Sequence, residues 1–128
     1  MSYAEEGKSV DDDLAWFKTL PLCYDTPEIF FCHAGLTYPK ISDNIAEDVL
    51  WGRDWIERDH RPREKQVVFG HTPDRRHMKA YFTNSGDICL DGGAVFGGMM
   101  SALILFDDDT PFEIVNVQRN KKDIHLEY

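Results

Sequence analysis

The sequence predicts a mixed α/β fold that ends in antiparallel strands, and the order of its periodic segments is the reason. Apolar residues with helical spacing occupy 9–20 and again 45–51. A short apolar run rich in β-branched and aromatic residues follows each of these segments, at 28–32 and 66–69. Strand-like runs separated by turns make up most of the chain after residue 80. This order, in 128 residues, predicts one domain or part of one.

The first helical segment begins with a polar cap and ends at a proline. Ser9 or Asp11 can cap its first turn, and the three aspartates at 11–13 place negative charge where the helix dipole favours it. Pro21 cannot continue a helix, so the segment is predicted to end at residue 20. Its apolar residues are Leu14, Phe17 and Leu20, with Trp16 beside them.

The rest of the chain alternates loops with one more helix and a series of strands. Residues 37–44 contain Pro, Ser, Asp and Asn, which predict a loop that leads into the helix at 45–51. A further turn is predicted at 54–59, and a charged connector at 58–65 precedes the second buried strand. The last four predicted strands span 81–83, 88–90, 101–106 and 112–117.

Charge and cysteine content limit the partners and the compartment. The net charge of -9 argues against nucleic acid and against an anionic membrane surface, because both select clustered Lys and Arg. The three cysteines, Cys23, Cys32 and Cys89, are odd in number and have no CxxC spacing, which predicts reduced thiols. No run of about 18 apolar residues that could span a bilayer occurs. We therefore predict a cytoplasmic protein.

Two histidines lie just after the two buried strands. His33 directly follows the strand at 28–32, and His71 follows the strand at 66–69 after Gly70. Ligands collect at the carboxyl ends of strands in α/β sheets, and imidazole suits Zn, Mn or Fe. The alternative is that each histidine is a hydrogen-bonded structural residue, since two histidines alone cannot complete a metal site. On spacing alone, the structural interpretation is favoured.

One arginine and one aspartate can likewise be interpreted either as site residues or as ordinary structural residues. Arg53 follows an aromatic residue and a glycine, and its planar guanidinium could bind a phosphate in bidentate fashion. It could equally form a surface ion pair with Asp54 or Glu57. Asp91 could orient a histidine, or it could be an ordinary turn residue that hydrogen-bonds its own backbone.

Four short motifs surround these residues. They are FFCHAGL at 30–36, LWGRD at 50–54, VVFGHTP at 67–73 and LDGGAVFGG at 90–98. In this order and spacing they resemble the PPP family of metallophosphatases, within the calcineurin-like phosphoesterase superfamily. The members that the chain resembles most are bacterial and phage serine/threonine protein phosphatases and symmetrical diadenosine tetraphosphate hydrolases. The resemblance covers roughly residues 10–117, and its specificity comes from the four motifs together.

The resemblance implies a fold and a set of site residues. The fold would be half of a metallophosphoesterase β-sandwich flanked by helices. The family has a two-metal centre, which holds manganese, iron or zinc. By their motifs, His33 and His71 would both ligate the second metal, and Arg53 would hold the phosphate oxygens. Asp91 would have a weaker, supporting role.

The resemblance also implies a reaction. A water activated between two metals would hydrolyse a phosphoester in line, with no covalent nucleophile. Phosphoserine and phosphothreonine monoesters on proteins are the favoured substrates, and dinucleoside tetraphosphates or another small phosphoester are the alternative. A third alternative is a non-catalytic binding domain with a vestigial site.

The chain departs from the family in one large respect. The family motifs GDxHG, GDxxDRG and GNHE, which supply the first metal site and the general acid, do not occur in it. We therefore expect residues 1–128 to be the C-terminal part of one metallophosphoesterase domain, with at most a partial metal site and no activity by itself. An exposed sheet edge would then favour self-association into a homo-oligomer.

Overall fold

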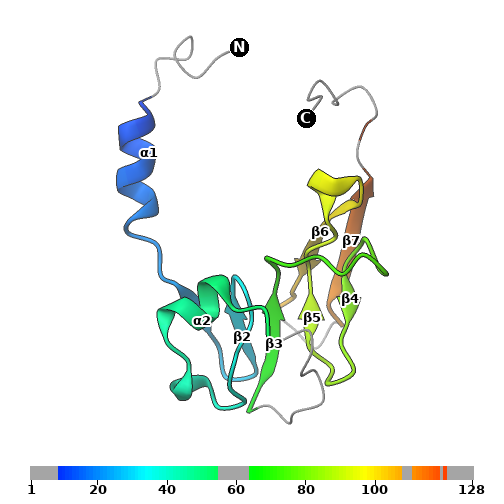
Figure 1. The fold of residues 1–128 in the computed structure, drawn as a ribbon, viewed down its shortest axis with the longest axis horizontal. Helices are drawn as coiled ribbons and strands as arrows, with labels where there is room; N and C mark the ends of the chain where they lie inside the picture. The colour runs from blue at the N-terminus through cyan, green and yellow to red at the C-terminus, as the bar shows by residue number, and fades with distance from the viewer. Residues whose placement is uncertain (1–8, 55–63, 108–110, 119, 121–128) are drawn as a thin grey trace.

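A computed structural model describes residues 9–54, 64–107, 111–118 and 120. They form two α-helices, a five-stranded sheet and a separate two-stranded antiparallel sheet (Figure 1). The predicted mixed α/β class, with antiparallel strands at its end, is confirmed. The helices are α1 (Val10–Phe17) and α2 (Ala46–Trp51), with short 3₁₀ helices at Ile41–Asp43 (η2) and Ala94–Phe96 (η3).

The larger sheet has a parallel centre and antiparallel edges, in the order β1-β2-β3-β5-β4. The central strands β2, β3 and β5 run parallel, with Phe31 opposite Val68 and Val68 opposite Ile88. The edge strands β1 and β4 run antiparallel to their neighbours. The strands are β1 (Cys23–Asp25), β2 (Ile29–Cys32), β3 (Gln66–Phe69), β4 (Tyr81–Phe82) and β5 (Ile88–Cys89).

The core lies between this sheet and the layer that contains α2. Phe30 and Val67, from the two predicted buried strands, pack there against Val49 of α2. Val67 is fully buried, because its side chain belongs to this core cluster on a central strand of the sheet. The remaining buried members of the core are Leu36, Phe69 and Cys89.

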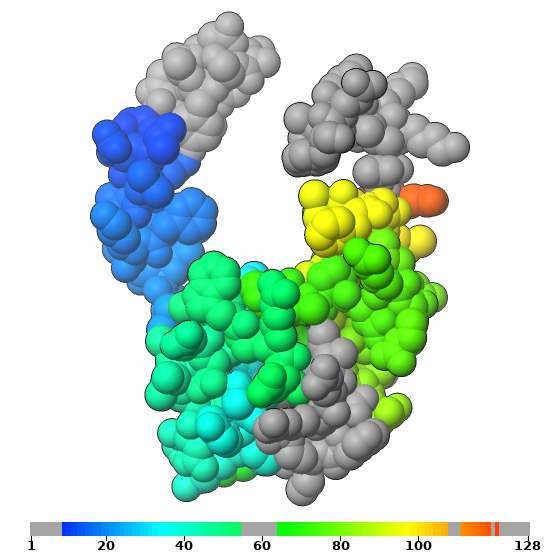
Figure 2. Space-filling view, viewed as in Figure 1, coloured from blue at the N-terminus to red at the C-terminus, as the bar shows by residue number. Residues whose placement is uncertain are grey.

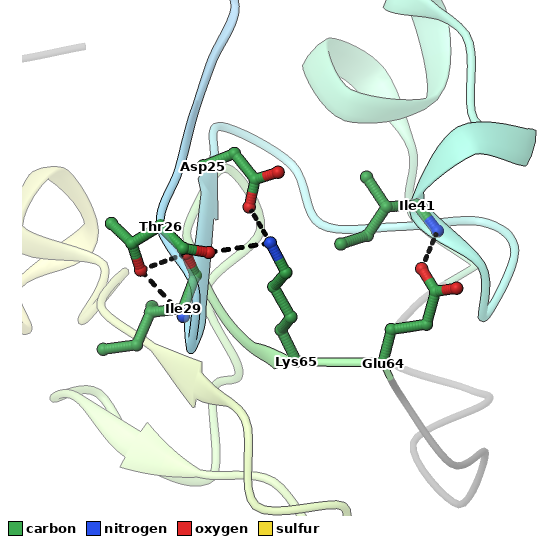
Figure 3. Close-up of polar contacts among 6 residues, drawn as sticks. All are labelled: Asp25, Thr26, Ile29, Ile41, Glu64 and Lys65. Atoms are coloured by element: carbon green, nitrogen blue, oxygen red, sulfur yellow. Dashed lines mark hydrogen bonds and ion pairs between the residues drawn. The ribbon is translucent and has the colours of Figure 1, made fainter.

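Polar contacts of Glu64 and Lys65 hold the start of β3 in place. Lys65 donates to the carboxylate of Asp25 at 2.5 Å and to the carbonyl oxygen of Thr26 at 2.7 Å (Figure 3). Glu64 accepts a hydrogen bond from the backbone N–H of Ile41 at 3.1 Å. The start of β3 is thereby tied both to the β1–β2 turn and to η2, which sets the register of the parallel pair.

The second sheet is a hairpin of β6 (Met99–Ile104) and β7 (Glu113–Gln118), whose residues are mostly half-buried or exposed. The backbone N–H of Ala80 donates to the side chains of Ser101 and Asn116, which joins the hairpin to the first sheet. The entry to β6 passes close to the loop after β5. A Cβ added at Gly98 would lie 1.9 Å from the carbonyl oxygen of Gly92, so only glycine fits there.

The two main differences between the prediction and the structure are the end of the first helix and one strand. The first helix has Ser9 as its N-cap, as expected, but it ends at Phe17 instead of residue 20. The hydroxyl of Thr19 donates to the carbonyl oxygen of Trp16 at 2.7 Å. This bond gives a carbonyl of the last helical turn a partner, so the helix can end before Pro21. The strand β1 was not predicted, because three residues carry too little periodic signal. Most of the predicted turn at 54–59 lies outside the described residues.

None of the helices in the described ranges has both the length and the apolar character needed to cross a membrane.

Candidate metal centre

The topology of the sheet brings the two predicted histidines to one place. His33 follows β2 and His71 follows β3, and these strands are parallel neighbours. The carboxyl ends of parallel strands meet at one edge of a sheet. The backbone N–H of Gly70 donates to the carbonyl oxygen of His33 at 2.8 Å, which joins the two loops directly.

The two imidazoles face each other through specific nitrogen atoms. Nε2 of His33 lies 3.0 Å from Nδ1 of His71, and the ring centroids are 4.8 Å apart with the planes at 62°. One nitrogen donates and the other accepts, according to the tautomers. The two imidazoles therefore converge, as expected from the sequence.

The backbone at His71 is held in a conformation that side-chain-bearing residues rarely adopt. Its φ is 71°, and the N–H of Thr72 donates to the carbonyl oxygen of Gly70 at 2.9 Å, which closes a γ-turn around the histidine. A positive φ at a residue other than glycine costs about 1–3 kcal/mol and tends to occur at functional sites. This strained turn aims Nδ1 of His71 at His33.

The surroundings of His71 favour its neutral form. Burial lowers the pKa of its imidazole, and the neighbouring His33 and Arg53 lower it further, while Asp91 opposes them. Trp51 packs edge-on against the ring, with centroids 5.7 Å apart. Nε2 of His71 is buried and has no hydrogen-bond partner among the described residues. A neutral imidazole has a lone pair available to bind a cation.

Arg53 and Asp91 also lie near the histidines. Arg53 is exposed, just beyond α2, and its charge reaches His71. Its alternative ion-pair partner Glu57 lies outside the described residues. Asp91 accepts a hydrogen bond from the N–H of Gly93 at 2.9 Å, as a turn residue does. It acts on His71 through its charge, since neither imidazole nitrogen of His71 bonds to it.

His33, His71 and Asp91 line a pocket of about 480 Å³ with mostly apolar walls. Sequence reasoning missed two features of this region. Trp51 was read only as part of a motif, although it contacts His71. Cys32, immediately before His33, lines the pocket, and burial raises the pKa of its thiol to about 12, so it stays protonated. The remaining pocket residues lie on β1, β2 and β3, before β1 and after β5, and they include Leu22, Tyr24, Phe31, Val68 and Leu90.

The nitrogen pair has a spacing that suits one shared cation. Two nitrogens about 2.1 Å from one ion lie about 3.0 Å apart at right angles and about 3.4 Å apart in a tetrahedral site, so the hydrogen-bonded separation of 3.0 Å is within reach of a shared ion. Within the described part of the chain, no group of three or more His, Cys, Asp or Glu residues forms a candidate metal cage. The residues fit a cation as a two-nitrogen partial site, and further ligands would have to come from water, substrate or another source.

Comparison of the chain with protein-family models, with curated proteins and with solved structures gave no significant match.

Proposed function

We propose that this chain carries part of the active site of a metal-dependent phosphoesterase, with phosphoserine and phosphothreonine monoesters as the favoured substrates. The observation that carries the proposal is the approach of His33 Nε2 to His71 Nδ1, at 3.0 Å, across the ends of two parallel strands. The strained turn at His71 supports it, because a positive φ there has no evident use in packing the core.

In this proposal each residue has a separate task. His33 and His71 bind one divalent ion of the manganese, iron or zinc class through the two facing nitrogens. Arg53, exposed beside them, binds the phosphate oxygens and orients the ester. Asp91 keeps the adjoining turn in place through Gly93 and adds negative charge near His71. A bound metal pair would supply a water of lowered pKa as the nucleophile.

Metal binding is the first test. Co²⁺ bound to imidazole nitrogen gives visible absorption, so a titration of the purified chain measures affinity and stoichiometry directly. We expect one ion per chain and at least a tenfold loss of affinity in His33→Ala and in His71→Ala. His77→Ala is the matched control, since His77 is exposed, stacks on Tyr81 and lies outside the histidine pair. Equal binding by all four proteins would refute the ligand assignment.

Phosphate binding is the second test. With Mn²⁺ present, we expect inorganic phosphate to bind the wild-type chain and to bind Arg53→Ala at least tenfold more weakly. Arg75→Ala removes another exposed arginine and serves as the control. Hydrolysis of p-nitrophenyl phosphate by the same preparations separates the alternatives. Binding without turnover is the result we expect of the chain by itself, and robust turnover would refute the partial-site proposal.

A further inference from the structure

Two of the three cysteines lie directly opposite each other on neighbouring strands. Cys23 on the edge strand β1 pairs with Cys32 at the end of β2 in the antiparallel register. Residues directly opposite in such a pair have their side chains on the same face of the sheet, with Cβ atoms about 4.5–5.5 Å apart. Both cysteines carry free thiols and are only partly buried. They have no CxxC spacing, so it is the pairing of the strands that brings them together.

The turn between the two strands determines what kind of pair the cysteines form. Pro27 and Glu28 make a two-residue turn, and the backbone N–H of Thr26 donates to the carbonyl oxygen of Ile29 at 3.0 Å. Hydrogen-bonded and non-hydrogen-bonded pairs alternate along an antiparallel ladder, so the two cysteines form a non-hydrogen-bonded pair. The Cα atoms of such a pair lie about 4.5 Å apart, within the range of about 4.4–6.8 Å that a disulfide spans.

Side-chain contacts hold the register of this hairpin. The hydroxyl of Thr26 accepts from the backbone N–H of Ile29 at 2.9 Å and donates to its carbonyl oxygen at 2.9 Å. Lys65 binds both the carboxylate of Asp25 and the carbonyl oxygen of Thr26, which ties β1 to the start of β3 (Figure 3). A slip of one residue would place the two thiols on opposite faces, so a fixed register keeps them together.

The two thiols share one environment at the margin of the core. Both side chains pack against the core cluster, and a charge on Cys23 raises the pKa of Cys32, which indicates that the two sulfur atoms are near each other. Helix α1, which precedes β1, extends away from the body of the molecule (Figure 2). Tyr24, next to Cys23, is 66% exposed. A small molecule can therefore approach the edge strand.

We propose that Cys23 and Cys32 are the site of a reversible disulfide, with a low-molecular-weight disulfide such as oxidised glutathione as the oxidant. The thiol of Cys23, on the edge strand, loses its proton to water. Its sulfur attacks the oxidant, which releases one glutathione thiolate and leaves a mixed disulfide. Cys32 then loses its proton, and its sulfur attacks Sγ of Cys23 and releases the second glutathione thiolate.

The reaction balances without any other reactant. Two protein thiols are oxidised to one disulfide, and one molecule of oxidised glutathione is reduced to two molecules of glutathione, whose thiolates take up the two protons. Burial raises the pKa of both protein thiols, so the exchange is slow. The inference does not depend on the proposed function, because it concerns neither metal nor phosphate.

The test measures the oxidation equilibrium of the full chain in buffers with defined ratios of glutathione to oxidised glutathione. The reaction is quenched with acid, free thiols are alkylated, and the protein is digested with trypsin. Residues 19–40 contain no internal Lys or Arg, so both cysteines fall in one tryptic peptide. The disulfide form of this peptide escapes alkylation and lacks two hydrogen atoms. Cleavage after Glu28 should then leave two fragments that stay joined until a reductant is added.

The paired strands should favour the disulfide over the same bond in an unfolded chain. We expect an equilibrium constant for the folded protein at least about tenfold above that in urea, because the hairpin already holds the two sulfur atoms together. Cys89 is the internal control, since it is fully buried and should remain a thiol in the folded chain. Cys23→Ser and Cys32→Ser should each leave this peptide only in alkylated or glutathione-bound form. A smaller ratio of the two constants, or pairing with Cys89 in the folded chain, would overturn the proposal.

Discussion

Replacing His71 by glycine and by alanine separates the strain of its backbone from the chemistry of its ring. Both substitutions remove the same imidazole, so both lose the contact with His33 and the edge-on contact with Trp51. Only glycine accepts a φ of 71° without a Cβ clash. The left-handed region costs a Cβ-bearing residue about 1–2 kcal/mol of stability. Glycine avoids that cost, but it lowers stability by about 0.5–1 kcal/mol because its unfolded chain has more conformational freedom to lose.

The difference between the backbone cost of alanine and the entropic cost of glycine predicts that His71→Gly is more stable than His71→Ala by about 0.5–1 kcal/mol. Urea unfolding of the two metal-free proteins measures that difference, and neither should bind Co²⁺ at the histidine pair. Lys40 provides the control position, because it is exposed and its φ of −84° suits any residue. There the order should reverse, with Lys40→Ala more stable than Lys40→Gly. If alanine is at least as stable as glycine at position 71, the strained turn is not present in solution.

Three further predictions concern parts of the fold that support the site. Asp87→Ala should lower the free energy of unfolding by about 2–3 kcal/mol in urea titrations, because the buried Asp87 accepts from Val67 N–H at 2.8 Å, and Asp87→Asn should cost less. Gly98→Ala should destabilise by at least about 1–3 kcal/mol in the same assay, since its methyl group would overlap the carbonyl oxygen of Gly92. The hydrogen bonds from Arg76 hold the pKa of Asp74 at about 2, below its ordinary 3.8. The stability that this depressed pKa contributes is present above about pH 4 and is lost as the pH falls towards 2. The melting temperature of Asp74→Asn should therefore fall less over that range than that of wild type, and parallel curves would contradict the assignment.

Much of the fold follows from local patterning. The strands around Phe30 and Val67 were predictable because continuous apolar runs bounded by polar residues are typical of buried parallel strands. The convergence of His33 and His71 followed from the same reasoning, since parallel neighbours end at the same edge.

Other features depend on contacts that no local pattern encodes. The early end of α1 depends on a single hydroxyl, that of Thr19. The strand β1 forms because its three residues pair with β2, and its own three residues are too few to show a strand pattern in the sequence. Burial of Asp87 could not be anticipated, because its acceptor role depends on the approach of the Val67 N–H from 20 residues away. The positive φ of His71 likewise arises from the bond that closes its turn, between its two neighbours.

The most direct test of the central claim is nuclear magnetic resonance of the imidazole nitrogens in ¹⁵N-labelled protein titrated with Zn²⁺. If one ion is shared, the resonances of His33 Nε2 and His71 Nδ1 should shift together and saturate at one equivalent, while those of His77 stay unchanged. Shifts at different equivalents, or at only one of the two facing nitrogens, would contradict a common cation between them.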